Sequence, residues 1–221
     1  MNKYINRKEG LRIDRNTNNL FVQNKLEKEK EKLNMKEEAQ KGFNFYGYNI
    51  NGAVIYALEY ALKMNPRYWD YEKWGGDCTN FISQCLHAGE IPFDHEGKDI
   101  RYHWYWYSDS NRTPSWTAAS QLQYYMQNNN TDDIGIGLKA HATTRDSILR
   151  GDIIQLIDGK GRAFHSMICT DYVVQDGFVI DYLISQHSGY DEDHSRRLRN
   201  YPLSLKEGTK IYWSIDGYYN R

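Results

Sequence analysis

Cys78 is the residue in this sequence best placed to do covalent chemistry. It follows Gly75, Gly76 and Asp77 and opens a helical pattern, which predicts a position in the first turn of a helix. At a helix N-terminus, unpaired backbone N–H groups and the helix dipole favour negative charge and lower the pKa of a thiol. The glycines let a substrate backbone approach closely. The backbone N–H of Cys78 itself could donate to a developing oxyanion. This arrangement predicts a nucleophile for acyl transfer.

The other cysteines and the acidic residues do not predict a metal or redox centre. The chain has three cysteines and no C-x-x-C spacing, which argues against a disulfide framework and against a structural zinc site. Cys85 lies two helical turns after Cys78 and is expected in the core. The cluster from Asp191 to His194 matches no ligand spacing and is interpreted as a solvated loop. We therefore expect no metal and no cofactor.

Seven histidines could supply the base that a cysteine nucleophile needs within hydrogen-bond reach. His87 is on the same predicted helix as Cys78, more than ~10 Å away at a rise of ~1.5 Å per residue. His165 begins an apolar strand that follows a Gly-Asp strand, and it is the predicted base. A third group should fix the tautomer of this histidine and steady the imidazolium.

The third group depends on the turn around Asp176 and Gly177. With a three-residue loop the two strands pair so that His165 faces His187 across the ladder. With a two-residue turn the register shifts by one residue, and His165 meets Ser188 with Gln186 diagonal to it. Both registers fit the sequence, so His187 and Gln186 are alternative third members.

The elements that would carry these residues form an α+β pattern. Apolar spacing and caps predict helices over residues 51–64, 77–89 and about 117–127. Alternating apolar residues and turn signals predict strands over 151–157, 164–174, 178–188 and 209–215. Helices followed by a run of antiparallel strands are typical of the α+β class. The aromatic run Trp104–Tyr107, with Trp116, could wall a substrate cleft or fill the core.

The stretch from Trp74 to Gly89 closely resembles the signature of the putative amidase domain family, with the core DCTNFxSQCLxAG. Residues 149–154, His165-Ser166 and 185–188 resemble it too, and the resemblance covers residues 46–213. That family is similar to the NlpC/P60 and CHAP groups of papain-like cysteine amidases. The resemblance implies a papain-like (NlpC/P60-like) helix packed on a small antiparallel β-sheet, with His165 as base. The NlpC/P60 pattern favours His187 as third member, giving the expected triad Cys78, His165 and His187.

The chain divides into two parts by composition. Residues 1–45 are rich in alternating Lys and Glu and are predicted to be a charged, helical or flexible N-terminal extension. Its few apolar residues, among them Leu26 and Leu33, could form a thin stripe for a partner or for oligomerisation. Residues 46–221 are predicted to be the papain-like amidase domain.

Charge and hydropathy narrow the function further. A net charge of −1 gives no field toward nucleic acid or anionic membrane. The sequence has no signal-peptide pattern and no apolar run of ~20 residues, so a cytoplasmic location is expected. The leading hypothesis is an amidase or peptidase that cleaves a peptide-like amide through a thioester acyl-enzyme. The alternatives are an amide synthase or transacylase that takes an acyl group from a small or carrier-bound donor, and a non-enzymatic binding module.

Overall fold

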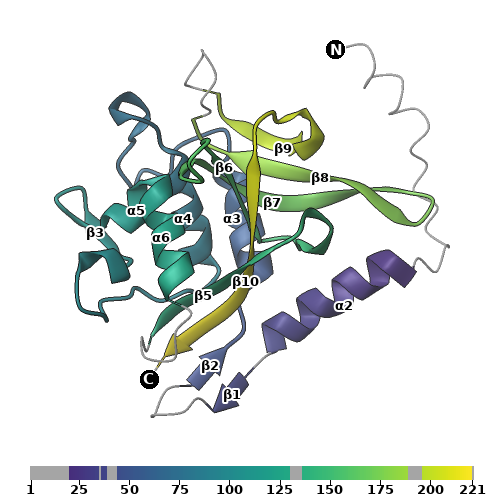
Figure 1. Ribbon diagram of the computed structural model, residues 1–221, viewed down its shortest axis with the longest axis horizontal. Coiled ribbons are helices and arrows are strands. Elements are labelled where there is room, and N and C mark those ends of the chain that lie inside the picture. Colours follow the sequence, from purple (N-terminus) through teal and green to yellow (C-terminus); the bar gives the residue numbers. More distant parts are fainter. Residues whose placement is uncertain (1–19, 35, 39–43, 130–135, 189–195, 221) are drawn as a thin grey trace.

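An antiparallel sheet of eight strands, which curls around one layer of helices, forms the centre of the structure (Figure 1). The computed structural model describes residues 20–34, 36–38, 44–129, 136–188 and 196–220. Within these residues the strand order is β1-β2-β10-β6-β7-β8-β9, and β5 pairs with the other edge of β10. The strands are β1 (Lys36–Glu38), β2 (Asn44–Tyr46), β5 (Gly137–Thr143), β6 (Ile153–Ile157), β7 (Ala163–Gln175), β8 (Phe178–Gln186), β9 (Leu198–Pro202) and β10 (Lys210–Asn220).

The helices lie on both sides of this sheet. They are α2 (Leu20–Asn34), α3 (Ile50–Tyr60), α4 (Cys78–Ala88), α5 (Pro114–Thr117) and α6 (Ala119–Asn128). Short 3-10 turns occur at Glu72–Trp74, Ile100–Tyr102, Arg145–Ser147 and Leu203–Leu205, and a separate hairpin joins β3 (Trp106–Ser108) to β4 (Asn111–Arg112). No helix in the described ranges is long and apolar enough to cross a membrane.

Alternating side chains give the sheet two buried faces. Ile153 and Ile168 pack with α3, α4 and α6 in the larger core cluster. Their sequence neighbours Ile154, Met167 and Cys169 belong to a second cluster. A strand that is buried on both faces reads as a continuous apolar run, as β6 does. The α+β prediction is confirmed at this level.

Most predicted elements are present, with shifted ends. The helix expected from residue 51 begins at Ile50, and its N-cap is Asn49, whose side chain accepts from Gly52 N–H at 2.9 Å. The helix predicted over 77–89 is α4, with Asp77 and Gly89 at its two caps. Strands β5 and β9 were not predicted from the sequence. The cluster from Asp191 to His194 lies outside the described residues.

The turn between β7 and β8 has two residues, Asp176 and Gly177, with φ of 48° and 92°. Gln175 therefore pairs with Phe178, and Ile168 pairs with Ser185 after two irregularities that cancel. A two-residue turn with positive φ at both positions matches the right-handed twist of the strands. The register is thus the alternative that sets Gln186, and not His187, diagonal to His165.

The aromatic run splits between core and surface. Trp104 and Trp116 are fully buried and pack against each other, with ring centroids 4.7 Å apart. The Trp104 indole N–H donates to Ser83 Oγ at 3.1 Å. Tyr107 is exposed. None of these three residues reaches the cavity described below, so the core interpretation is the one the structure supports for the two tryptophans.

Candidate active site

Cys78 lines a cavity of about 360 Å³ at the N-terminus of α4. The cavity is also lined by Tyr71, Trp74, Gly75, Gly76, Arg112, Thr117, Ala118, Ala119, Ser120, Ala163 and Phe164. Gly75 and Gly76 have φ of 105° and 115°, a conformation that other residues adopt only with strain. These glycines bring the chain into α4 at the angle that leaves the sulfur facing the cavity. The Cys78 backbone N–H makes no hydrogen bond to a described residue.

A buried chain of hydrogen bonds ends at the Cys78 sulfur. The Trp213 indole N–H donates to Gln155 Oε1 at 3.0 Å, which fixes the orientation of the Gln155 amide. Gln155 Nε2 then donates to Ser166 Oγ, also at 3.0 Å. Ser166 Oγ lies 3.1 Å from Thr79 Oγ1, which lies 3.7 Å from Cys78 Sγ. The Gln155 amide can only donate to Ser166, which lets each following hydroxyl donate toward the sulfur. Sequence reasoning did not identify this chain, because its members come from four separate elements.

Burial raises the pKa of the Cys78 thiol, and the charge of Asp77 adds to the rise. The Thr79 hydroxyl and the backbone N–H of Ser166, which both hydrogen-bond toward the sulfur, act in the opposite direction. The expected lowering by the helix N-terminus is therefore wrong for this resting state, because desolvation of the thiolate outweighs the donors. The raised pKa favours the thiol over the thiolate at Cys78.

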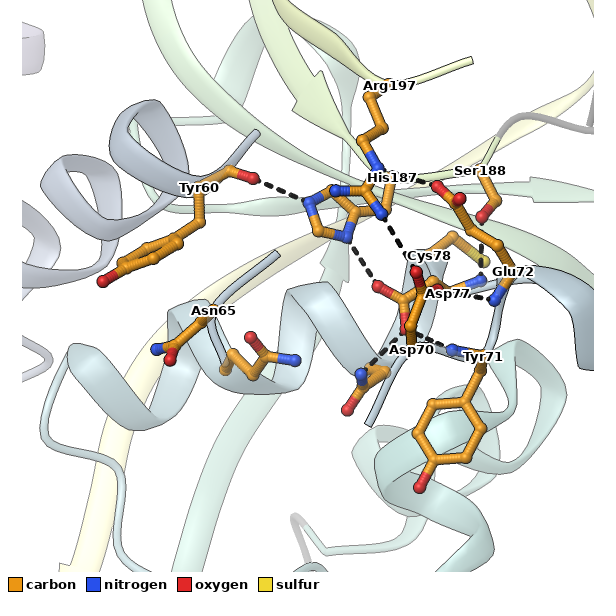
Figure 2. A network of polar contacts seen from close by, with 12 residues as sticks. Tyr60, Asn65, Asp70, Tyr71, Glu72, Asp77, Cys78, His187, Ser188 and Arg197 are labelled. Carbon is orange, nitrogen blue, oxygen red and sulfur yellow. Dashed lines mark hydrogen bonds and ion pairs between the residues drawn. The ribbon is translucent and has the colours of Figure 1, made fainter. Parts of the chain in front are cut away.

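Asp77 and His187 form a buried pair behind the nucleophile (Figure 2). His187 Nδ1 lies 2.6 Å from Asp77 Oδ2, and Nε2 donates to the backbone carbonyl of Tyr60 at 2.8 Å. The ring stacks on Phe81 with centroids 4.1 Å apart. Asp77 Oδ1 accepts from Tyr71 N–H at 3.1 Å and Asn80 Nδ2 at 2.8 Å. Asp77 thus holds the start of α4 in place rather than capping it with its side chain.

The protons of this pair can be assigned from its partners. A carbonyl only accepts, so His187 Nε2 carries a proton, and a further proton lies between Nδ1 and the carboxylate. Whichever atom holds that proton, the pair is neutral overall. The proton on the His187–Asp77 contact therefore offsets the Asp77 charge that opposes thiolate formation at Cys78.

His165 is held by Gln186 rather than by His187. The ring Nε2 lies 2.9 Å from Gln186 Oε1, and Gln186 Nε2 donates to Arg196 O at 3.2 Å, which fixes the orientation of the amide. The expected contact between His165 and His187 is wrong, because the two-residue turn sets the other register and because His187 uses both ring nitrogens elsewhere. Since Gln186 Oε1 accepts, Nε2 of His165 carries the proton and Nδ1 is the basic nitrogen.

The structure brings the strand of His165 to the nucleophile. Ser166, the next residue, contacts both Cys78 and Thr79, and Ala163 and Phe164 line the cavity. Thr79 and the backbone of Ser166 are hydrogen-bond partners of the sulfur among the described residues. In enzymes without substrate, catalytic hydrogen bonds are often long and shorten only in the substrate complex.

The fold and the site together define an α+β protein with a cysteine at the start of a buried helix, facing a cavity. The model of the family described as "Putative amidase domain" matches residues 47–214, and the chain belongs to this family. The family description points to amide-bond hydrolysis at a coarse level. Helix α2 and strands β1 and β2 lie before the matched region.

Two relatives come from Bacillus subtilis (strain 168). The chain is 35% identical over 135 residues to "Uncharacterized protein YhbB", covering 60% of this chain and 40% of YhbB. It is 30% identical over 175 residues to "Uncharacterized protein YjcM", covering 76% of this chain and 36% of YjcM. The chain thus matches less than half the length of these curated relatives. No solved structure matches the chain.

Proposed function

We propose that the protein is a cysteine amidase in which Cys78 attacks an amide carbonyl, His165 is the base and Gln186 orients that base. The observation that carries this proposal is the position of Cys78. Its sulfur faces a cavity in the first turn of α4 and accepts hydrogen bonds from Thr79 and from the backbone of the His165 strand. Helix α4, which begins with Cys78, precedes the strand β7 of His165 and its partner β8 in the chain. This order supports a relationship to the papain-like NlpC/P60 and CHAP enzymes.

The reaction would proceed in two steps. His165 Nδ1 takes the thiol proton as Cys78 Sγ bonds to the carbonyl carbon, and the imidazolium then protonates the departing amine. The Cys78 backbone N–H is a donor for the oxyanion. In the second step water, activated by His165, attacks the thioester and releases the acid and the thiol.

Alkylation kinetics with iodoacetamide test the base assignment. We expect His165→Ala to slow the labelling of Cys78 at pH 7 by about a hundredfold, the lower end of the range for a general base. His187→Gln should slow the labelling of Cys78 less than His165→Ala does, because both ring nitrogens of His187 are bound to Asp77 and Tyr60. Thermal melting of each variant checks the fold. If His165→Ala labels at the wild-type rate while a folded His187→Gln does not label, His187 and not His165 is the base.

The acyl acceptor is tested separately. Incubation with an amide substrate and excess glycinamide should yield free acid as the main product if water resolves the thioester. A transamidation product that rises in proportion to glycinamide would instead support acyl transfer to amines.

A further inference from the structure

Arg112 is the charged side chain that lines the Cys78 cavity. All other lining residues are aromatic, small or hydroxylic, so within the described residues the cavity carries one positive charge and no negative one. Arg112 comes from β4, in the small hairpin that lies outside the main sheet. Tyr71 also lines the cavity, and burial raises its pKa to about 12, so its hydroxyl stays neutral.

The guanidinium of Arg112 has donors left over. Nη1 donates to the backbone carbonyl of Asp109, while Nε is buried and has no acceptor among the described residues. Nη2 makes no hydrogen bond to a described residue either. The group lies over the ring of Tyr71, with Cζ 4.8 Å from the centroid, which holds its plane. The unused Nε–Nη2 edge is the one with which arginine binds a carboxylate through two parallel hydrogen bonds.

Of the nearby carboxylates, Asp109 forms an ion pair with Arg112 through Nη1 alone. Asp109 Oδ1 is 3.7 Å from Arg112 Nη1, but the Asp109 side chain is 52% exposed and lies outside the cavity lining. It also accepts the Tyr71 hydroxyl at 2.9 Å. Glu72, on the adjoining 3-10 turn, is paired with Arg197 at 2.7 Å. Asp109 therefore meets Arg112 at Nη1 and leaves the Nε–Nη2 edge to a ligand.

We propose that the substrate amide carries a carboxylate within about one residue of the scissile bond, and that Arg112 recognises this carboxylate. This inference rests on the proposed function of Cys78. Cys78 and Arg112 line the same cavity of about 360 Å³, so one ligand can contact both residues. Ala119 and Ser120, in the first turn of α6, line the same cavity and add a smaller positive potential.

Matched electrophiles that alkylate the cysteine test the proposal without a known substrate. Chloroacetyl-glycine places a terminal carboxylate one residue from the reacting carbon, and chloroacetyl-glycinamide is its neutral counterpart. Chloroacetyl-aspartic acid α-amide, whose backbone carboxyl is amidated and whose side chain stays acidic, separates a side-chain carboxylate from a terminal one. The measured quantity is the ratio of the Cys78 alkylation rates, acidic over neutral, in each protein, with the site of labelling confirmed by mass spectrometry.

We expect at least one acidic probe to react about tenfold faster than the neutral probe, the effect of one charge-assisted hydrogen-bond pair. The ratio should fall to about one in Arg112→Gln and lie between in Arg112→Lys. Arg101→Gln is the matched control, because Arg101 also pairs with a local aspartate but is exposed and outside the cavity. Raising the salt concentration should lower the wild-type ratio.

The outcomes separate the two proposals. If acidic and neutral probes alkylate Cys78 at equal rates, and this labelling still depends on His165, the carboxylate inference is overturned and the amidase proposal stands. Absence of His165-dependent labelling with any probe, in folded protein, would overturn the proposed function. The faster of the two acidic probes identifies the carboxylate as terminal or as a side chain.

Discussion

Helices α2 and α4 are both packed against the sheet, but with opposite chemistry. α4 is buried through Phe81, Ile82, Cys85 and Leu86. α2 lies on the other side (Figure 1), and its inward residues are Lys25, Glu29 and Lys32. Helix α4 is held by burial of apolar area. Helix α2 is held by hydrogen bonds of charged groups, which weaken when one partner is lost.

The contacts of α2 are specific. Lys25 Nζ donates to the carbonyls of Ile148 and Asp146, and Lys32 Nζ donates to the Ile215 carbonyl at 2.8 Å. Glu29 forms two bonds with the guanidinium of Arg150, at 3.0 and 2.6 Å. Lys25 and Glu29 are only 5% and 6% exposed, so this face of the charged helix is buried against the domain. Of the apolar residues predicted to form a stripe for a partner, Leu33 is 43% exposed and Leu26 is half-buried.

The largest effect should come from the residue that gives α4 its chemistry. Cys78→Ser should lower amide turnover at least a thousandfold, because a serine hydroxyl at this position lacks the acidity and nucleophilicity of a thiol. Activity assays with purified protein measure this. Cys85→Ser, on the same helix but in the core, is the control for removal of a thiol. Substantial turnover in Cys78→Ser would contradict a covalent role for the sulfur.

Phe81→Ala tests how strongly the apolar face of α4 stabilises the fold. Loss of a fully buried ring should lower the free energy of unfolding by about 3–5 kcal/mol. It also removes the surface on which His187 stacks. Urea denaturation gives the value, and Ile55→Ala, at an exposed position of α3, is the reference. A loss below about 1 kcal/mol would mean that α4 is held by something other than its apolar face.

Glu29→Gln tests how strongly the charged contacts of α2 hold it against the domain. It leaves the Arg150 guanidinium without its ionic partner, and we expect the docking of α2 to weaken by about 2 kcal/mol, the range for hydrogen bonds to charged groups. Trypsin should then cleave after Lys28 or Lys30 about thirtyfold faster, if cleavage follows undocking. Glu31→Gln, which changes an exposed glutamate of the same helix, is the control. Equal cleavage in both variants would show that the Glu29–Arg150 pair does not hold α2.

The smallest effect concerns pH. Burial lowers the pKa of Lys25 from its usual 10.5. Between the folded and unfolded pKa values the unfolded chain binds more protons, so the contribution of Lys25 to stability rises with pH in this window. The free energy of unfolding of wild type minus that of Lys25→Met should therefore increase from pH 8 to pH 10. Lys28→Met, at an exposed position, should show no such trend. A decrease for Lys25→Met would mean that the charged form is the one the fold prefers.

Several elements could be predicted from the sequence because their burial leaves a periodic pattern. The apolar spacing of Phe81, Ile82, Cys85 and Leu86 gave α4 and its caps, and the apolar run after Gly151 gave β6. β5 was missed because Gly137–Thr143 mixes Gly, Lys and His with few apolar residues, and its pairing with β10 joins segments about 70 residues apart. Such long-range pairing leaves no local signal.

The candidate site divides in the same way. The sequence by itself determined the position of the proposed nucleophile: Cys78 follows two glycines and an aspartate at a helix start, which is a local pattern. It also determined that two strands near His165 and residues 186–188 meet, since a turn at Asp176-Gly177 joins them. Only the tertiary structure shows that His165 contacts Gln186 and not His187, because a one-residue change in the turn moves every side chain to the other face. It alone placed Arg112 in the cavity and Lys25 and Glu29 in the interior, because the sequence records which side chains are charged but not which partners compensate their burial.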